Sequence, residues 1–366
     1  MLFYEPRGKV DEIENTTKLL IKISTYDWDS RETSWDFEQS PLLNGAPSLS
    51  DAYARWLEGV SRDFFQLHAN EEELNRIFIE IYGLQEELTP EVPLKDITIL
   101  QEELDRGKLE ELEPVFRARG REGIQLPIQK EEVLAQFVSY CVGVMLGRYR
   151  LGQPGLHIAH PKPTTGELAP YTFHGHPIHI DQDAILPIMG SDCHFADDVL
   201  QQLNHLLLAI WGEDQLTASL NFLQEGLGMG LSEWLTRKFW PYHTAMYKKK
   251  PIYWMFCSNL AQPHKAAFRV LCYMHPMDRF TVQRIQRNYL HPHQEYIRRE
   301  IEKLKAHEST LDRQESRRLE MLQAWDIECR DYHEVLKEMA NRQIEFDLDD
   351  GVTVNYAKFE GVVARI

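Results

Sequence analysis

A regular spacing of large apolar residues in the last third of the chain constrains its fold more than any other feature. The spacing alternates steps of three and four residues along Leu322, Trp325, Cys329, Tyr332, Leu336 and Met339. Such a pattern places these side chains on one side of an α-helix. A similar, earlier series runs through Ile297, Ile301, Leu304 and Leu311. Because the phase slips between the two series, we predict a long antiparallel helical hairpin over about residues 285–341.

The rest of the chain is also predicted to be mainly helical. Amphipathic patterns indicate a short helix over residues 8–24 and two helices between residues 50 and 82, with Gly83 as the C-terminal cap of the second. Residues 131–150 are apolar on most faces, which is typical of a buried helix. Gly143 and Gly147 are expected to permit close contact between this helix and another one.

A smaller part of the chain favours strands. Residues 252–256 predict a buried strand, while residues 265–275 fit either a helix or a strand. The tail from residue 344 becomes β-branched and aromatic around Asp350 and Gly351, a pair that suits a tight turn, so a terminal strand or hairpin is expected. The predicted fold is mainly α with minor β structure (α+β): a multi-helix body, the helical hairpin near the C-terminus and short terminal strands.

Composition divides the chain into three predicted regions. Residues 1–150 form a helical region, residues 151–198 an irregular connector rich in His and Pro, and residues 199–366 a C-terminal domain with a basic strand segment, the hairpin and a terminal strand. The segment after the first helix mixes Trp28, Trp35 and Phe37 with acidic residues. We predict that it is an ordered loop packed by its aromatic rings.

Charge is unevenly distributed along this acidic chain. Its formal net charge of −17 would repel DNA or an anionic membrane if it were evenly spread. Residues 1–130 hold 15 Lys and Arg residues against 27 Asp and Glu residues, whereas residues 279–318 hold ten basic residues against six acidic ones. Three consecutive lysines also precede the predicted strand at 252–256.

These basic residues are candidates for contacts with DNA phosphates. The candidate DNA-binding residues are Lys248, Lys249, Lys250, Arg284, Arg287, Arg298 and Arg299. An alternative interpretation is that the lysines mark the start of a buried strand and that Arg298 pairs with Glu295 or Glu302 on an exposed helix face. The pattern alone favours the two interpretations about equally.

Other motifs point to structural roles. The stretch Gly226–Gly230 (GLGMG) resembles a nucleotide-binding loop, but a helical pattern rather than a strand precedes it, so we predict a helix terminus. The stretch Asp347–Gly351 resembles part of a calcium loop without its later ligands, which favours a solvated turn. No complete catalytic or cofactor-binding motif is found, so no catalytic, cofactor-binding or metal-binding residues are assigned.

Histidines cluster in the predicted connector. They are His157, His160, His174, His176, His179 and His194, with Asp181, Asp183 and Cys193 nearby. Imidazole, thiolate and carboxylate groups are zinc ligands, so a zinc-dependent activity is one interpretation. Because HExxH and CxxC motifs are both absent from the sequence, histidines of a surface loop are favoured.

The five cysteines are odd in number and form no CxxC pair, which favours a reducing compartment. The chain begins without the apolar core of a secretion signal, and no segment approaches 18 consecutive apolar residues. We therefore predict a cytoplasmic location and no membrane partner.

Five separated motifs carry a resemblance to a known family. They are DWDSRETSWDF (27–37), ELNRIFIEIYGLQEELTPEVPLKDITIL (73–100), SYCVGVMLGRYRLGQPGL (139–156), KKPIYWMF (249–256) and DLDDGVTVNYAKF (347–359). Together they resemble PglX, the family of large adenine-specific DNA methyltransferases of BREX phage-defence systems. The resemblance covers the C-terminal part of that family.

The resemblance implies a module that follows a target-recognition domain and supports the binding of double-stranded DNA. The methyltransferase domain and its S-adenosylmethionine would belong to a part absent from this chain, so we expect no cofactor here and no methyl transfer by this chain alone. The alternative is a protein-interaction scaffold that binds other BREX components or a phage antagonist without touching DNA.

Overall fold

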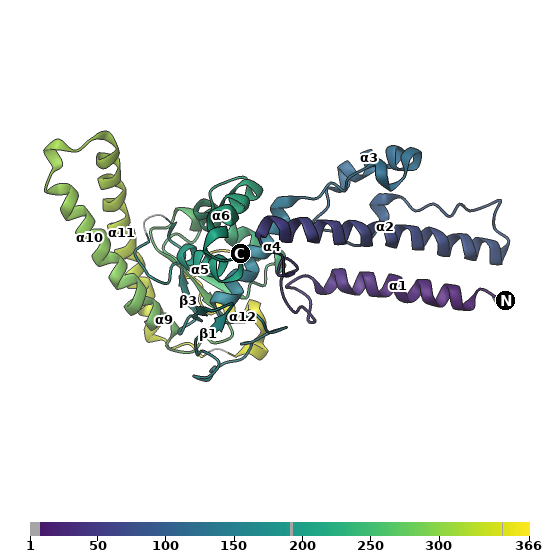
Figure 1. Ribbon diagram of the computed structural model, residues 1–366. Coiled ribbons are helices and arrows are strands. Elements are labelled where there is room, and N and C mark those ends of the chain that lie inside the picture. The colour runs from purple at the N-terminus through teal and green to yellow at the C-terminus, as the bar shows by residue number, and fades with distance from the viewer. Residues whose placement is uncertain (1–7, 191–192, 346) are drawn as a thin grey trace. The chain divides into compact units, whose positions relative to one another are not determined.

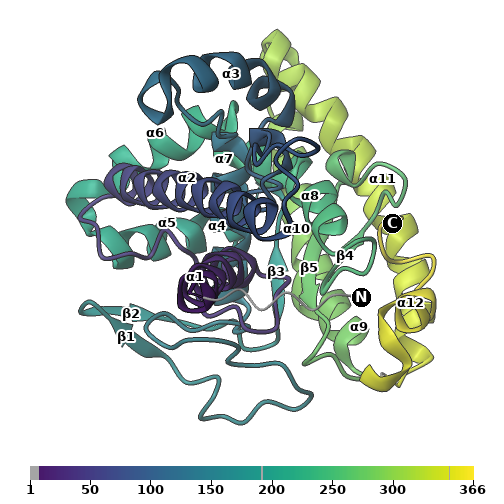
Figure 2. The same ribbon diagram turned by 90° about the vertical axis from the view of Figure 1, so that its right-hand side faces the viewer.

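The computed structural model describes residues 8–190, 193–345 and 347–366 (Figures 1 and 2). The chain divides into two compact units, Met1–Phe137 and Val138–Ile366. The division falls within helix α4 (Lys130–Met145). Most of the described chain is helical, with one two-stranded and one three-stranded sheet, which confirms the predicted fold class. Across these residues, no helix combines the length and the apolar character needed to span a membrane.

Two long helices, α1 (Val10–Asp29) and α2 (Leu49–Tyr82), lie side by side in the first unit (Figure 1). Helix α3 (Arg106–Arg119) and the short 3-10 turns η1 (Leu94–Asp96) and η2 (Arg121–Gly123) complete it. Apolar side chains from these elements form one buried cluster that includes Ile23, Phe64, Phe65, Leu67, Leu94, Ile97 and Leu109. Burial of this cluster holds the helices of the unit together.

Helix α2 is continuous, so the prediction of two helices between residues 50 and 82 is wrong. Ser48 caps its start, because its hydroxyl accepts a hydrogen bond from the backbone N–H of Asp51 at 3.1 Å. Gly83 ends the helix with φ 70°, as predicted. Between these caps the sequence contains no proline and a single glycine, Gly59, so nothing interrupts the backbone hydrogen bonds of the helix.

The predicted packing of the loop after α1 by its aromatic rings is confirmed for Phe37, which is 5% exposed, and wrong for the two tryptophans. Trp28 belongs to α1 and is 66% exposed, while Trp35 is 99% exposed. Polar contacts also order this loop, since the hydroxyl of Ser34 donates a hydrogen bond to Asp29 Oδ1 at 2.7 Å. The two indole rings therefore remain on the surface.

Helix α4 is buried along most of its length, as predicted. A Cβ atom on Gly143 would lie 2.6 Å from the ring of Tyr149 and 2.9 Å from the hydroxyl of Tyr253. Gly147 lies beyond the end of the helix and has φ 79°. The predicted helix contact is therefore wrong, because Gly143 admits aromatic side chains and Gly147 supplies a turn.

Three antiparallel strands form the larger sheet, in the order β3 (Ile185–Pro187), β5 (Arg269–Tyr273), β4 (Tyr253–Cys257). Tyr253 pairs with Tyr273 at one end, and Cys257 pairs with Arg269 at the other. Every residue of β4 and β5 is buried. The prediction of a buried strand at 252–256 is confirmed, and the ambiguous segment 265–275 contains a strand.

The region 151–198 is largely irregular but contains β3 and a small hairpin of β1 (Tyr171–Phe173) and β2 (His176–Ile178). Its residues 191 and 192 lie outside the described chain. Four helices follow: α5 (Val199–Trp211), α6 (Glu213–Leu227), α7 (Leu231–Arg237) and α8 (Phe239–Met246). Gly228 ends α6 with φ 70°, which confirms that GLGMG is a helix terminus.

The helical hairpin is confirmed (Figure 1). Its first arm consists of α9 (Thr281–Arg284), a turn of π-helix η5 (Ile285–Leu290) and α10 (His291–Lys305), which follow one another without interruption. Helix α11 (Arg313–Asn341) returns along α10. The short 3-10 turns η4 (Pro263–Lys265) and η6 (Glu308–Thr310) lie before α9 and between the two arms, respectively.

The predicted terminal strand is wrong. A 3-10 turn, η7 (Leu348–Asp350), and helix α12 (Gly351–Ala357) occupy the tail, of which residue 346 lies outside the described chain. Side-chain hydrogen bonds of Asn355 to the backbone carbonyls of Asp347 and Gly351 stabilise this helical turn. A single β-bridge, between Phe256 and Val363, is all that remains of strand pairing in the described tail. Local capping therefore overrides the β propensity of the sequence.

Candidate nucleic-acid interface

The three candidate lysines, Lys248–Lys250, form an exposed turn directly after α8. Their backbone N–H groups donate hydrogen bonds to the carbonyls of Ala245, Thr244 and Tyr247, at 2.9, 2.8 and 2.9 Å respectively. Lys248 and Lys249 have φ 50° and 62°, a left-handed conformation that side chains other than glycine adopt at a cost. The turn is thus pinned through its backbone, and its side chains are free to extend from it.

No ion pair joins these three lysines to a carboxylate within the described parts of the chain. Their position at the C-terminus of α8 offers a structural explanation as well, because cations are favourable at the negative end of a helix dipole. We refer to Lys248–Lys250 as the lysine turn.

The arginines of the first hairpin arm differ in how they are paired. Arg284 Nη1 donates a hydrogen bond to Asp278 Oδ2 at 3.1 Å, and its Nη2 forms an ion pair with Asp278 Oδ1 at 2.9 Å. Burial opposes ionisation of Asp278, but the hydrogen bond from Arg284 lowers its pKa below the usual value. The charge of Arg284 is therefore largely neutralised within the protein, whereas Arg287 is exposed.

Arg298 and Arg299 lie on the exposed surface of α10. The Nε of Arg298 lies 3.3 Å from Asp326 Oδ1 on α11, so the predicted pairing of Arg298 within its own helix is replaced by a contact across the hairpin. A half-exposed pair of this kind contributes little to stability. Both arginines are thus accessible at the surface, and Arg298 is held there only by its weak pairing with Asp326.

The seven candidates do not form one cluster. The lysine turn leads into the end of the sheet where Tyr253 pairs with Tyr273. His293, five residues before Arg298 on α10, contacts the carbonyl of Ala267 at 2.9 Å, just before the opposite end of β5. Fourteen residues of continuous helix separate Arg284 from Arg298, a distance of about 21 Å at 1.5 Å per residue. The structure thus separates the lysine turn from the arginines of α10.

The connector histidines are dispersed among several partners. His157 contacts the carbonyl of Glu167 at 2.9 Å, and His160 pairs with the carboxylate of Glu167 at 2.8 Å. His194 stacks on Tyr296 of the hairpin with ring centroids 4.4 Å apart. Within the described ranges, no three His, Cys, Asp or Glu side chains converge with a geometry that could hold a metal ion.

A cavity of about 330 Å³ in the second unit was not expected from the sequence. Its polar lining includes Asp181, Asp183, Asp197 and Tyr289. The hydroxyl of Tyr289 lies 3.0 Å from Asp183 Oδ1 and 3.2 Å from Asp197 Oδ2. Burial and the charge of Asp183 raise the pKa of Asp181 well above its usual value. Tyr289 belongs to the π-helical turn η5, which the periodicity of the sequence does not predict.

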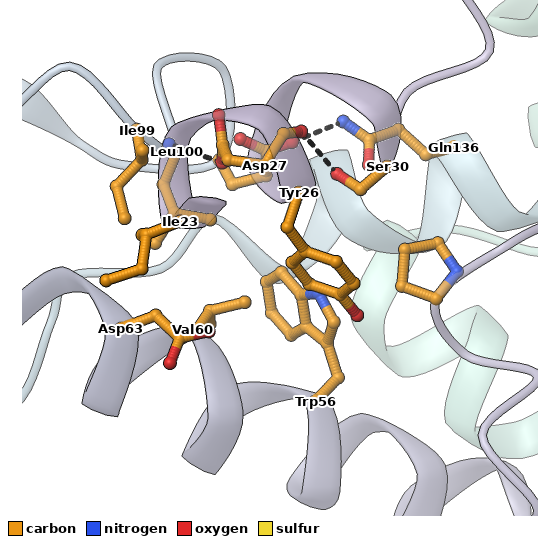
Figure 3. Close-up of a pocket in the computed structure, with 12 residues that line it drawn as sticks. Ile23, Tyr26, Asp27, Ser30, Trp56, Val60, Asp63, Ile99, Leu100 and Gln136 are labelled. Atoms are coloured by element: carbon orange, nitrogen blue, oxygen red, sulfur yellow. Dashed lines mark hydrogen bonds between the residues drawn. The ribbon is translucent and has the colours of Figure 1, made fainter. Parts of the chain in front are cut away.

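A second, smaller pocket lies in the first unit (Figure 3). Figure 3 shows Tyr26, Trp56 and Asp27 among its lining side chains, with Asp27 accepting a hydrogen bond from the backbone N–H of Leu100 at 2.9 Å. Its volume of about 20 Å³ is close to that of a single water site. This pocket is therefore too small for a nucleotide.

Arg148, in the GRY stretch of the third family-like motif, was not among the predicted site residues. It is 9% exposed, although arginine is seldom buried. Its Nε donates a hydrogen bond to the hydroxyl of Tyr149 at 2.9 Å, and its Nη1 lies 3.5 Å from the hydroxyl of Tyr273. In the sequence, Arg148 stands out only as a charged residue that follows an apolar stretch. That position does not indicate that its side chain is buried.

Comparisons with known proteins identify relatives. The chain is 32% identical over 368 residues to "Adenine-specific methyltransferase PglX" of Lacticaseibacillus casei (strain Zhang), which covers 95% of this chain and 28% of that protein. It is 30% identical over 383 residues to "Adenine-specific methyltransferase BrxX" of Escherichia coli O9:H4 (strain HS), which covers 99% of this chain and 30% of that protein. No family model matches the chain.

The chain thus spans less than a third of the length of these relatives, which is consistent with the predicted correspondence to a C-terminal portion. The resemblance predicted from the five motifs is confirmed: over nearly its whole length, this chain is related to the PglX and BrxX adenine-specific methyltransferases.

Proposed function

We propose that this chain is a non-catalytic C-terminal portion of an adenine-specific DNA methyltransferase of the PglX type, and that it supports DNA binding and site recognition in phage defence. The similarity over 95–99% of the chain supports the parentage. The lysine turn is the observation that carries the DNA contact. It combines three exposed ammonium groups with a backbone held by three hydrogen bonds.

The physical argument rests on conformational entropy. A lysine on a free tail loses backbone and side-chain freedom when it contacts a phosphate, whereas a lysine on a pinned turn loses mainly side-chain freedom. No carboxylate in the described residues competes with a phosphate for these ammonium groups. Arg287, Arg298 and Arg299 would add weaker contacts farther along the hairpin.

Methyl transfer belongs to the rest of such an enzyme in this proposal. The S-adenosylmethionine site and the adenine-binding pocket would lie in the more than two thirds of the relatives that this chain does not match. This chain alone would therefore bind duplex DNA, in the cytoplasm, without methylating it.

The test is the salt dependence of binding to a labelled duplex. We expect the joint change Lys248→Ala, Lys249→Ala and Lys250→Ala to flatten the slope of log affinity against log salt by up to about 2.7, because each lost phosphate contact removes about 0.9. Fluorescence anisotropy at several salt concentrations measures this slope.

A matched control removes three exposed lysines from the first unit: Lys18→Ala, Lys22→Ala and Lys108→Ala. The two variants lose the same net charge, so a difference between them reports on position. Equal slopes for the two variants and the unchanged protein would exclude the lysine turn as a DNA contact.

A second candidate function is supported by the exposed aromatic residues of the first unit. Trp35 is 99% exposed, Trp28 is 66% exposed and Tyr26 is 61% exposed. Large rings of this kind are enriched where proteins bind one another. This observation favours a scaffold that binds another BREX component or a phage antagonist.

Pull-down with each partner at high salt distinguishes the two functions. The scaffold predicts retention that Trp28→Ala with Trp35→Ala abolishes, together with no shift of duplex DNA at low salt. Retention of the partner by the double variant would exclude these rings as its binding surface.

A further inference from the structure

Arg148 is a buried cation whose partners are all neutral. It is 9% exposed, and its hydrogen bonds reach the hydroxyls of Tyr149 and Tyr273. The guanidinium also lies 5.3 Å from the ring centroid of Tyr149. Its Nη2 makes no hydrogen bond within residues 8–190, 193–345 and 347–366. The Nη2 group of the guanidinium is therefore a hydrogen-bond donor without a partner among the described residues.

Buried charges in proteins are usually paired with an opposite charge, because desolvation of a lone ion is costly. The other charged arginine in this unit with comparable burial is satisfied by backbone carbonyls: Arg269 donates to Ile188 at 2.7 Å and Pro263 at 2.8 Å. Arg148 lacks this support. The hydroxyl of Tyr273 donates its own hydrogen bond to the carbonyl of Ile158, at 2.6 Å.

Two buried histidines near Arg148 are neutral at neutral pH and bring no negative charge to it. The pKa of His275 is about 4 because of burial and then the charge of Arg148, and the same two causes lower the pKa of His243 to about 3. The Nε2 of His243 accepts backbone hydrogen bonds from Ile252 and Tyr253, so its proton resides on Nδ1. Both Nδ1 atoms are buried without a partner in the described chain.

Contacts between aromatic rings connect this group to the residue before the lysine turn. The ring centroid of Tyr253 lies 5.6 Å from that of Tyr273, which contacts Arg148, and 4.7 Å from that of His243. His243 lies on α8, with its ring centroid 4.8 Å from that of Tyr247. Arg148 is therefore linked through Tyr273, Tyr253 and His243 to Tyr247, the residue before the lysine turn.

We propose that Arg148 anchors a phosphate-binding site beside the lysine turn, with its unused Nη2 as the donor and a phosphate group of the DNA backbone as the ligand. The proposal rests on the proposed function and deepens it, because it assigns a specific phosphate contact to a residue outside the exposed basic set. A planar guanidinium fits two phosphate oxygens better than an ammonium group does. The surrounding hydroxyls fix its orientation.

The first arm of the test uses inorganic phosphate with the whole chain. We expect phosphate to raise the melting temperature above that in sodium chloride of equal ionic strength. Arg148→Gln removes the charge, and we expect this variant to lose the rise. Arg150→Gln is the matched control, since Arg150 lies two positions away, stacks on Tyr171 at 4.2 Å and should leave the rise intact. Equal rises in all three proteins would overturn the site.

The second arm uses duplex DNA and identifies the source of the phosphate. Arg148→Gln should flatten the salt slope by about 0.9 relative to Arg150→Gln, the value of one phosphate contact. An unchanged slope together with the phosphate-specific rise in melting temperature would overturn DNA as the source and leave a site for free phosphate.

Two measurements guard against loss of folding and against confusion with the lysine turn. If Arg148→Gln does not fold, phosphorus NMR of inorganic phosphate titrated with the unchanged protein replaces it, and a resonance that neither shifts nor broadens overturns the site. The variant of the three lysines tests the proposed function separately. It should retain the rise in melting temperature with phosphate, whether or not its DNA slope changes.

Discussion

Asp183 lies beside Asp181 and disfavours ionisation of its carboxyl group. The two residues are linked through the backbone, because Asp181 Oδ1 accepts hydrogen bonds from the N–H groups of Asp183 at 3.2 Å and Ile185 at 3.0 Å. Burial contributes most to raising the pKa of Asp181, and the charge of Asp183 comes next. This arrangement fixes a turn just before β3 at the expense of a carboxylate that resists ionisation.

The pH dependence of stability should follow from this raised pKa. The native state holds the proton of Asp181 more tightly than the unfolded chain does, so the free energy of unfolding falls as pH rises from the usual carboxyl pKa through the higher native value. Asp181→Asn keeps the accepting oxygen and removes the charge. We expect its melting temperature at neutral pH to rise by about 2–4 °C. Thermal unfolding followed by circular dichroism across pH measures this.

Asp214→Asn, at an exposed position of α6, is the control for that experiment. It should change the melting temperature little at any pH. A fall in the melting temperature of Asp181→Asn at neutral pH would show that the ionised carboxylate stabilises the turn.

Removal of one partner of a buried ion pair in the first unit should lower stability strongly, because the other charge is left buried without that partner. Arg31 Nη2 lies 2.8 Å from Glu103 Oε2, and the side chains are 13% and 3% exposed. Gln136 donates a hydrogen bond to the other oxygen of Glu103 at 2.8 Å. Glu103→Ala leaves Arg31 with Asp27 alone and should cost about 3 kcal/mol in urea unfolding.

The exposed pair of Lys95 and Glu110, 2.7 Å apart, provides the comparison. Glu110→Ala should change the urea unfolding midpoint little, because solvent screens the pair. Similar costs for the two variants would mean that burial adds nothing at Glu103.

Gly143→Ala should destabilise the protein by about 1–3 kcal/mol, because the new methyl group would overlap the ring of Tyr149 at 2.6 Å. Gly59→Ala, in the middle of α2, is the matched change, since a Cβ there meets nothing within 4 Å. That variant should gain about 0.5–1 kcal/mol from helix propensity. Chemical denaturation of both variants tests the pair of predictions, and a tolerated Gly143→Ala would contradict the close packing.

Removal of the cap of α11 should weaken the hairpin. The carboxylate of Asp312 accepts a hydrogen bond from the N–H of Glu315 at 2.8 Å, and Glu315 accepts one from the N–H of Asp312 at 2.9 Å. Asp312→Ala should cost about 1 kcal/mol. Hydrogen exchange of the first turn of α11 reports the effect, with the exposed Glu320→Ala as control. Unchanged exchange would show that packing against α10 alone fixes this end.

The sequence predicts the long periodic elements of this protein well. The hairpin follows from the spacing between Leu322 and Met339, and the buried strand β4 follows from a short apolar run after Pro251, because burial on one side or on all sides leaves a direct trace in residue order. The continuity of α2 and the helical tail were missed. The prediction placed a boundary within α2 although no residue there interrupts the helix. In the tail, the side chain of Asn355 favours a turn that propensity alone does not reveal.

The candidate site is harder to predict because it depends on contacts between distant segments. The exposure of Lys248–Lys250 could be read from the residue types. The pairing of Arg284 with Asp278 and the burial of Arg148 could not, since the latter requires Tyr273, 125 positions away, to pack against it. The cavity at Asp181 likewise depends on Tyr289, 106 positions from Asp183, which a π-helical turn presents.

The last residues of the described chain lie along the outer side of β4. Val363 forms a bridge with Phe256, and the N–H of Ala364 donates a hydrogen bond to the carbonyl of Met255 at 2.8 Å. Strand β4 is the edge strand of its sheet, and an edge strand without such a cover is a template for intermolecular pairing and aggregation. The tail therefore acts as a shield: truncating it would expose an apolar edge built from Trp254 and Phe256 to other copies of the protein.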